Sequence, residues 1–405
     1  NSGLLNTDLY ITKLIPNNYL QGSEVPFYVG NLDSVFEKHQ KWQTLLPRVT
    51  PFYAVKCNNN LAVLRTLSAL EQVLTVPREL EMVMSIGVTP DKIIYAHTTK
   101  PQSHIRYACA QGVDMMTFDN EEELLKITRG HPNAKLLLRI AVDDSKSQVK
   151  LSTKFGATLG TVGSLLKRAH ELDLDVKGVS FHVGSLCTDS VAYRRAIEEV
   201  HHVFEQRIIG FQLDLLDIGG GFSGHELEMV LNSKATVWAL DEFFPADSGV
   251  RVIAEPGRYF VDSAFTLALN VFAKKKVWSL PINGNGLDTM IMYYVTDGLY
   301  GAFGDIKLYP DIKPFVLRPH RSVESTEPRY QSVIWGPTCD SADRIMDVWM
   351  PELNIGDWIL VDNFGAYTIP MSTDFNGFEK PTIYLVVTPQ IWKMLNLKVS
   401  NLRFG

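Results

Sequence analysis

A lysine at the end of an apolar run is the first residue that could do chemistry. In PFYAVKCN (Pro51 to Asn58), Lys56 follows the apolar stretch Phe52 to Val55. A lysine where a buried strand opens into a loop is expected to be half sheltered and within reach of a ligand. Burial lowers the pKa of a lysine and favours the neutral amine, which forms Schiff bases with carbonyl compounds. On this octapeptide alone, a solvated lysine at a strand end is the alternative.

A glycine-rich stretch could bind an anion. LLDIGGGF places three glycines just beyond a buried strand: Gly219, Gly220 and Gly221. Glycines let backbone N–H groups approach an anion closely, and a following helix N-terminus adds a favourable dipole. The alternative is a tight strand-to-loop turn.

The motif EPGR contains a carboxylate, a glycine and a guanidinium, at Glu255, Gly257 and Arg258. Glu255 could hold a pyridine nitrogen protonated, and Arg258 could bind phosphate. A Glu–Arg salt bridge beside a Pro-Gly turn explains the same residues without a ligand.

Three more motifs carry polar or reactive side chains. FHVGS offers His182 and Ser185, WGPTCD places Cys339 beside Asp340, and DNFGAY ends on Tyr367. A hydrogen-bonded histidine, an inert buried cysteine and a core tyrosine are the structural alternatives. Taken together, the motifs supply a Schiff-base lysine, a carboxylate for a ring nitrogen, a phosphate cradle and a thiol acid. The cofactor that needs all four is pyridoxal 5'-phosphate (PLP).

The elements that must position these residues follow a regular rhythm. From residue 50 onward, short β-rich runs end at eight points: Lys56, Val76, Tyr95, Phe118, Ile140, Phe181, Asp217 and Glu255. Helical stretches lie between most of them. Eight alternations predict a (β/α)8 barrel, whose active site forms at the carboxyl ends of the strands. A doubly wound sheet is the alternative, because periodicity cannot decide whether the sheet closes.

The rhythm stops after about residue 270. Strand-like runs and loops rich in Pro and Gly follow, with few helices. We therefore predict a PLP-binding barrel over residues 30–268 and a C-terminal β-domain over residues 269–405. The N-terminal segment, residues 1–29, is predicted to join the β-domain.

Composition excludes several classes of function. The net charge is −6 and no stretch is densely basic, which argues against nucleic acid and anionic membranes as partners. No apolar run approaches membrane-spanning length. The four cysteines are widely spaced without a CxxC pair, which argues against zinc sites and favours a reducing compartment. A cytoplasmic location is therefore expected.

Over nearly its whole length the chain resembles the eukaryotic ornithine decarboxylase family. The matching motifs, in order, are PFYAVKCN, MMTFDNEEEL, KFGATL, GVSFHVGS, LLDIGGGF, ADSGVRVIAEPGRYF, IWGPTCD, GDW and GAYT. The resemblance implies an alanine-racemase-like PLP barrel with a C-terminal β-domain and active sites shared across a homodimer. The implied reaction is decarboxylation of ornithine to putrescine, in polyamine biosynthesis.

The resemblance also implies a role for each motif residue. Lys56 would hold PLP as a Schiff base, Glu255 would pair with the ring nitrogen, and His182 would stack on the ring. Arg139 would support the cofactor's face. Cys339, from the partner subunit, would protonate the substrate carbon after CO2 leaves, and Asp340 would bind the substrate's far end. The phosphate would be held by Ser185, Gly221, Arg258 and Tyr367, and Gly219, Gly220 and Gly257 would also belong to the cofactor-binding site.

The first departure from the family concerns the substrate. Where the family has an aspartate that grips the distal ammonium of ornithine, the segment LYGAFGDIKLYPD has Pro310, and Asp311 follows one position later. An unpaired buried cation would cost about 1–3 kcal/mol or more. A neutral amino acid such as leucine avoids that cost, whereas a one-residue shift that returns Asp311 to the site would retain ornithine.

The second departure lies in the second βα loop. The family's GTGFDCAS is replaced by EQVLTVP (Glu71 to Pro77), two residues shorter. Codons for GTGFDCA read one nucleotide later give EQVLTVP, so a gene-model or splicing artefact is our hypothesis for this stretch. VLTV nevertheless has strand character.

A catalytically inactive antizyme inhibitor is the alternative function, because those relatives share the fold. Lys100 to Lys126 resembles the family's antizyme-binding element, including Arg106, Glu123 and Lys126, although two ordinary surface helices explain it equally well. A pure inhibitor has no need of PLP chemistry, and the lysine, glycine loop, EPGR and Cys339 are all intact. The sequence therefore predicts a PLP-dependent amino-acid decarboxylase.

Overall fold

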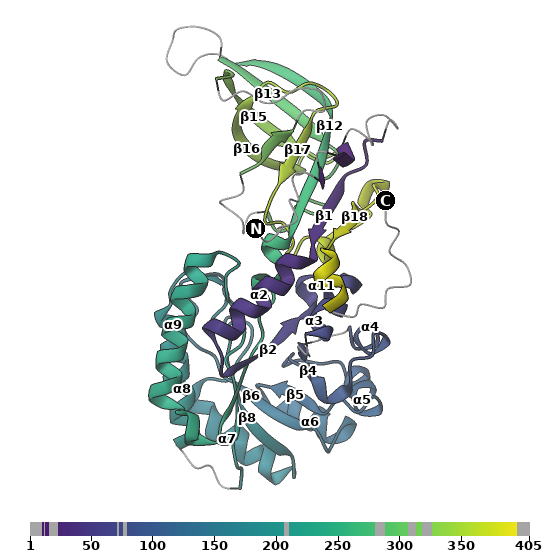
Figure 1. Cartoon of the computed structure of the whole chain (residues 1–405). Helices are drawn as coiled ribbons and strands as arrows, with labels where there is room; N and C mark the ends of the chain where they lie inside the picture. Colours follow the sequence, from purple (N-terminus) through teal and green to yellow (C-terminus); the bar gives the residue numbers. More distant parts are fainter. Residues whose placement is uncertain are drawn as a thin grey trace. The chain divides into compact units, whose positions relative to one another are not determined.

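The computed structural model describes residues 10–11, 13–15, 23–70, 73–75, 79–205, 210–279, 288–306, 313–317 and 326–394. The chain forms two compact units (Figure 1). One, the barrel unit, takes Val35–Phe260 with Lys393–Gly405, and the other, the β-unit, takes Asn1–Ser34 with Val261–Trp392.

The barrel unit is built on eight parallel strands that close into a ring. In ring order they are β10 (Leu215–Asp217), β11 (Arg251–Ala254), β2 (Val49–Ala54), β3 (Val73–Thr75), β4 (Ile93–Tyr95), β5 (Met115–Phe118), β6 (Lys135–Arg139) and β8 (Asp175–Ser180). Parallel pairing of β8 with β10 completes the ring. The predicted (β/α)8 barrel is confirmed, and the doubly wound sheet is excluded. Val73–Thr75 of the divergent second segment is one of the strands; Glu71, Gln72, Val76 and Pro77 lie outside the described residues.

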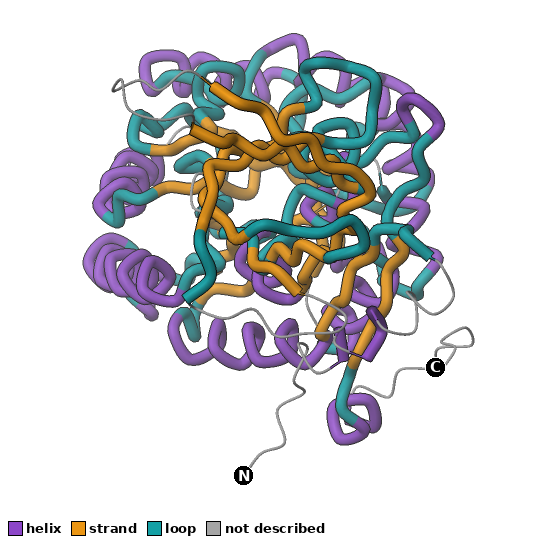
Figure 2. The backbone as a smooth tube through the Cα atoms, turned by 90° about the horizontal axis from the view of Figure 1, so that it is seen from above, coloured by secondary structure: helices purple, strands orange, loops and turns teal. Residues whose placement is uncertain are grey.

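Helices surround these strands (Figures 1 and 2). They are α2 (Leu32–Leu45), α3 (Leu61–Ala69), α4 (Leu80–Ser85), α5 (Gln102–Ala110), α6 (Glu121–Gly130), α7 (Leu159–Glu171), α8 (Val191–Glu205), α9 (Glu226–Phe243) and the short α10 (Arg258–Val261). The start of α6 shows why a helix begins there. Asn120 Oδ1 accepts from Glu123 N at 2.9 Å, and three glutamates follow in the first turn. Such a cap satisfies a free N–H, and acidic residues favour the positive end of the helix dipole.

Apolar side chains fill the barrel interior as a layer. Phe52, Ile94, Leu137, Leu215 and Ile253 form one buried cluster. Four of the five come from alternate strands of the ring, which is the layered packing expected inside a (β/α)8 barrel. The interior is thus a packed core, and polar side chains are left to the strand ends.

The β-unit is a mixed sheet of eight strands. Its main path is β14 (Phe315–Leu317), β17 (Trp358–Val361), β12 (Phe265–Ser279), β13 (Asp288–Val295), β15 (Arg329–Trp335) and β16 (Arg344–Pro351). β1 (Phe27–Asn31) pairs antiparallel with β12 and parallel with β18 (Thr382–Val386). Phe27 and Val29 of β1 pack with Ala268, Trp358 and Leu360 in one buried cluster. The last described element is the helix α11 (Pro389–Met394).

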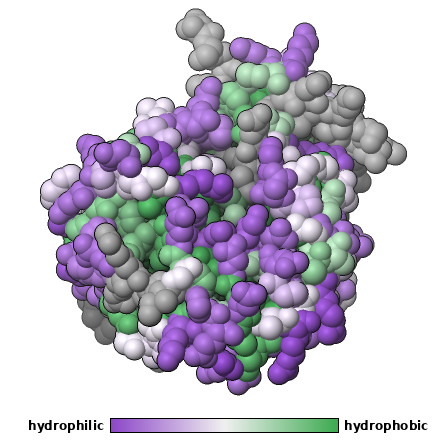
Figure 3. Space-filling model, turned by 90° about the horizontal axis from the view of Figure 1, so that it is seen from below, coloured by the Kyte–Doolittle hydropathy of each residue, from purple (hydrophilic) through white to green (hydrophobic). Residues whose placement is uncertain are grey.

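The surface is mixed in polarity. Figure 3 shows hydrophilic side chains over much of one face, with apolar groups gathered in smaller patches. Exposed apolar side chains on α9 include Leu227 and Trp238, and the Arg194 guanidinium lies 4.6 Å from the Trp238 ring centre. Among the described residues, no helix is both long and apolar enough to cross a membrane.

Closure of the ring depends on a glycine in β8. A Cβ added at Gly178 would lie 1.8 Å from the carbonyl oxygen of Leu215 in β10. We expect Gly178→Ala to lower the free energy of unfolding by about 1–3 kcal/mol or more, because the backbone itself must move. Urea denaturation would measure the change. Gly163→Ala in α7 is the matched control: its Cβ meets no atom within 4 Å, so a gain of up to about 1 kcal/mol is expected. Equal effects of the two substitutions would contradict this account.

Candidate functional site

Lys56 lies in a short 3-10 helix, Val55–Cys57, directly after β2. Val55 and Cys57 are buried, whereas Lys56 is exposed. The prediction of a half-sheltered lysine is therefore wrong. One turn of a 3-10 helix takes three residues, so one of the three must point away from the core. The lysine is presented at the carboxyl end of the strand, where the barrel fold places its chemistry.

The EPGR loop packs against the turn that carries Lys56. Ala54 N donates to Pro256 O at 3.0 Å. A Cβ at Gly257 would lie 2.9 Å from Cys57 Cβ and 3.2 Å from Ala54 Cβ. Gly257 therefore lets the loop after β11 approach the lysine turn closely. Arg258, the next residue, begins α10 and is 5% exposed.

The three glycines pack against the ends of the neighbouring strands. Gly219 and Gly221 have φ of 62° and 99°, values that favour glycine. A Cβ at Gly220 would lie 2.8 Å from His182 Nε2 and 2.8 Å from Glu255 O. The loop can thus take no side chain without displacing these neighbours. Tyr193 from α8, which sequence reasoning missed, donates its hydroxyl to Gly220 O at 3.1 Å.

His182 is partly buried and sits beside two cations. Its Nδ1 accepts from Gly184 N at 3.0 Å. Burial, together with the positive charges of Arg139 and Lys56, lowers the pKa of the imidazole well below its usual value. The ring is therefore neutral near pH 7, with its proton on Nε2. Ser185, three residues later, is partly buried and begins β9 (Ser185–Cys187), which pairs antiparallel with β7 (Ser147–Val149).

Two carboxyl groups and a guanidinium lie together at the ends of β10, β11 and β6. Asp217 is fully buried, and its Oδ1 accepts from Gly219 N at 2.9 Å. Its buried Oδ2 has no hydrogen-bond partner among the described residues. Burial and the charge of Glu255 raise the pKa of Asp217 well above its usual value. Burial lowers the pKa of Arg139, and Glu255 and Asp217 oppose that shift.

Asp217 was not among the predicted site residues, because it was taken only as the end of a strand. The available signal was an acidic residue that closes the apolar run before three glycines. The structure brings together Lys56, Arg139, His182, the glycine loop and Glu255, and the buried Asp217 lies next to the glycine loop. All of these residues belong to the barrel unit.

Comparison with known proteins decides the family. Residues 32–262 match the family model "Pyridoxal-dependent decarboxylase, pyridoxal binding domain". Ornithine decarboxylase of Rattus norvegicus is 49% identical over 385 residues, which cover 91% of this chain and 82% of that protein. The chain belongs to the ornithine decarboxylase family. It is by family a PLP-dependent carboxy-lyase.

Other members of the ornithine decarboxylase family resemble the chain to a similar degree. Antizyme inhibitor 2 of Xenopus laevis is 47% identical over 392 residues, covering 93% of this chain and 84% of that protein. The solved structure of the Paramecium bursaria Chlorella virus arginine decarboxylase bound to agmatine has a TM-score of 0.84 at 37% identity. The matched region covers 91% of this chain and 100% of the viral enzyme's chain. Enzymes and inhibitors are therefore both relatives, and overall similarity does not separate them.

The site residues fit the family's cofactor. The glycine loop carries no side chains, so its backbone can approach an anion such as a phosphate closely. A neutral imidazole offers a flat face for a ring, and an exposed amine is free to react with an aldehyde. The carboxylate of Glu255 has the charge that a protonated ring nitrogen requires.

Three predicted residues belong to the β-unit: Cys339, Asp340 and Tyr367. Cys339 is exposed. Asp340 accepts from Ala342 N at 2.9 Å and from the Tyr300 hydroxyl, and these bonds lower the pKa of its carboxyl. Tyr367 is partly buried with φ of 56°. Pro310 and Asp311 lie outside the described residues.

A buried aspartate shapes the loop that carries Cys339. Asp343 is 1% exposed and accepts from Leu299 N at 2.7 Å and from the Thr338 hydroxyl at 2.7 Å. It thereby ties the Cys339 loop to the segment that carries Tyr300. Sequence reasoning missed Asp343, although a second aspartate three residues after Asp340 was visible.

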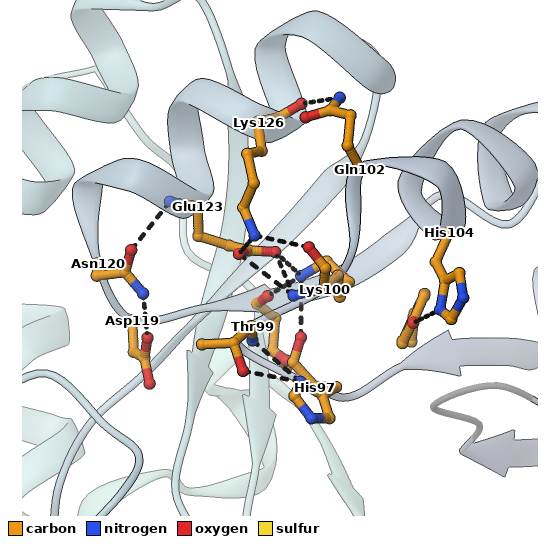
Figure 4. Close-up of polar contacts among 11 residues, drawn as sticks. His97, Thr99, Lys100, Gln102, His104, Asp119, Asn120, Glu123 and Lys126 are labelled. Atoms are coloured by element: carbon orange, nitrogen blue, oxygen red, sulfur yellow. Dashed lines mark hydrogen bonds and ion pairs between the residues drawn. The ribbon is translucent and has the colours of Figure 1, made fainter.

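The segment Lys100 to Lys126 contains a buried charged cluster (Figure 4). Lys100 is 1% exposed, and its ammonium bonds to Glu123 Oε1, Thr117 O and His97 O at 2.9, 2.6 and 2.9 Å. Lys126 pairs with the other Glu123 oxygen at 2.5 Å. Glu123 is 1% exposed, so it is engaged inside the unit and is not a surface contact. Arg106 on α5 is exposed.

The buried Lys100 predicts a pH dependence of stability. Burial lowers its pKa from 10.5 to about 8, although Glu123 opposes the shift. Between these values the unfolded chain binds more protons than the folded one, so the free energy of unfolding rises with pH. Across the full window the rise is about 3 kcal/mol.

We expect Lys100→Met to remove this rise in urea denaturations from about pH 8 to about pH 10. The exposed Lys92 provides the control, since Lys92→Met should keep the wild-type slope. Identical slopes in wild type and Lys100→Met would show that Lys100 does not titrate in this window.

Proposed function

We propose that the chain is a PLP-dependent decarboxylase of an amino acid with a distal ammonium, with ornithine as the first candidate. The observation that carries the proposal is the cluster at the barrel's strand ends: an exposed lysine, a neutral histidine, a glycine cradle and an acidic pair. Support for a basic substrate comes from Asp340, whose carboxyl is held ionised by Ala342 N and Tyr300. A neutral aliphatic substrate such as leucine is the alternative, favoured by Pro310.

Each residue has a definite task in this proposal. Bound PLP supplies an electron sink for the charge left on the substrate as CO2 departs. Lys56 provides the amine that holds the cofactor, Glu255 keeps the ring nitrogen protonated, and His182 lies on the ring face. The N–H groups of the glycine loop, with Arg258, bind phosphate. Cys339 then donates the proton that replaces CO2.

We propose that the chain acts as a homodimer, as its resemblance to the family implies. Lys56 belongs to the barrel unit and Cys339 to the β-unit, and in the proposed dimer Cys339 serves the partner's site. A strict monomer would then lack the proton donor. A cytoplasmic location, suggested by the unpaired cysteines, is part of the same proposal.

Lys56→Ala is expected to abolish CO2 release from ornithine, and Cys339→Ala to reduce it by about 10²–10⁴-fold, the usual worth of a positioned general acid. Cys109→Ala, another exposed cysteine, is the matched control and should retain full activity. Mixing the two inactive variants should restore roughly a quarter of wild-type activity, because random pairing gives half the dimers one intact site of two. No recovery on mixing would contradict sites shared between subunits.

The substrate question is tested with Pro310→Asp. We expect this change to raise CO2 release from ornithine relative to leucine, because the added carboxylate pairs the distal ammonium. The assay compares ornithine, lysine, arginine and leucine with transcript-verified protein and added PLP. An unchanged ratio would refute the role given to Pro310.

Antizyme binding without catalysis is the second candidate function. It is favoured by the similarity to an antizyme inhibitor and by the exposed Arg106 on α5. If wild type releases CO2 from none of the four amino acids, this function takes precedence, and titration of the chain with antizyme by calorimetry would measure it.

A further inference from the structure

A buried tyrosine bonds to the backbone of the glycine loop. Tyr193, in the first turn of α8, is fully buried and donates its hydroxyl to Gly220 O at 3.1 Å. Its ring packs on Phe222, with the two ring centres 4.9 Å apart. Burial and the nearby Cys187 raise the pKa of the Tyr193 hydroxyl well above its usual value. The hydroxyl therefore keeps its proton and remains a donor.

This hydrogen bond fixes the direction of one peptide group. In a trans peptide the C=O and the N–H that follows it point in opposite directions, and none of the described residues has a cis peptide bond. Since Gly220 O points at Tyr193, the N–H of Gly221 points away from it. Within the described part of the chain this N–H has no protein acceptor, and Gly221 is partly exposed. Water or a bound anion must therefore accept from it.

The peptide needs a restraint because a glycine lies on each side of it. Turning the peptide over changes ψ of Gly220 and φ of Gly221, and glycine adopts both signs of φ at little cost. The turned peptide would present a carbonyl oxygen, with its partial negative charge, where the N–H had been. An anion at the loop would then be repelled. The Tyr193 hydroxyl opposes the rotation, because the carbonyl of the buried Gly220 would lose its partner.

We propose that Tyr193 is a positioning residue: through Gly220 O it holds the peptide between Gly220 and Gly221 so that the Gly221 N–H faces the phosphate of the cofactor. The inference rests on the proposed function, because that function places the phosphate at the glycine loop. A hydroxyl that does not touch the cofactor thus sets part of the affinity for its phosphate group.

Binding of PLP and of pyridoxal to the full chain tests this role. Pyridoxal has the same ring and aldehyde as PLP but no phosphate. Tyr193→Phe removes the hydroxyl and keeps the ring that packs on Phe222. We expect this change to raise the Kd of PLP by roughly threefold to tenfold, the usual worth of one hydrogen bond, and that of pyridoxal by less than about twofold. Fluorescence titration measures both constants.

Tyr259→Phe is the matched control. The Tyr259 hydroxyl also donates to a backbone carbonyl, Lys38 O at 2.9 Å, but that carbonyl belongs to α2 and not to the glycine loop. The Kd of this variant for each ligand should stay within about twofold of wild type. Circular dichroism of both variants shows whether they are folded, and pyridoxal binding shows whether the rest of the site is intact.

Three outcomes would overturn the proposal. Equal weakening of PLP and pyridoxal binding in Tyr193→Phe would mean that the whole site had loosened. An unchanged PLP affinity in that variant would mean that the hydroxyl does not act on the phosphate. Wild type that binds PLP no more tightly than pyridoxal would lack a phosphate site at all. If wild type prefers PLP, Tyr193→Phe loses part of that preference and no CO2 is released, the decarboxylase function fails while this inference stands.

Discussion

The packing of the glycine loop against His182 and Glu255 is the contact on which the site depends. Gly220 has less than 3 Å of room on both sides for an added carbon, so the ends of β8, β10 and β11 are held at one fixed separation. Barrel closure makes that separation possible, since the β8–β10 ladder brings the sixth and seventh strands together. A small error in this packing would move the imidazole, the carboxylate and the phosphate cradle together.

Charge within the barrel unit is arranged in two networks of different kind. Asp217, Glu255 and Arg139 lie next to the glycine loop at the candidate active site, where shifted pKa values are often part of catalysis. The cluster of Lys100, Glu123 and Lys126 instead joins the loop after β4 to β5 and α6, and its donors are used up by protein oxygens. Its role is to fix the rim: His97, which receives one bond from Lys100, is within electrostatic range of Lys56.

Much of the barrel could be predicted, because its signals are local. The β-rich runs gave the strands and their carboxyl ends, and the motifs after those ends included most of the residues that the structure brings together. The exposed position of Lys56 could not be predicted, since an apolar run does not reveal that its last residues form a 3-10 turn. Nor could the Lys100–Glu123 pair, whose members are 23 residues apart and meet only when β4 and β5 are adjacent. Asp217 could be seen at the end of its strand, but its proximity to Glu255 could not be predicted. Glu255 lies 38 positions later in the chain, and the two residues are neighbours only because β10 pairs with β11.

Decarboxylases and antizyme inhibitors share one fold, so the fold cannot choose between them, and individual residues must. Retention of α5 and α6 as packed helices requires the buried cluster around Lys100, whichever function the chain has. Lys56 contributes little to stability, because its exposed side chain buries no apolar surface. The glycine loop also contributes little, because ordering a glycine costs more conformational entropy than ordering another residue. The same holds for the fully buried Asp217, because taking a carboxyl group out of water costs free energy. These features reduce the stability of the fold and lie at one site. Catalysis would explain why they are kept, whereas binding to a partner protein would not require them.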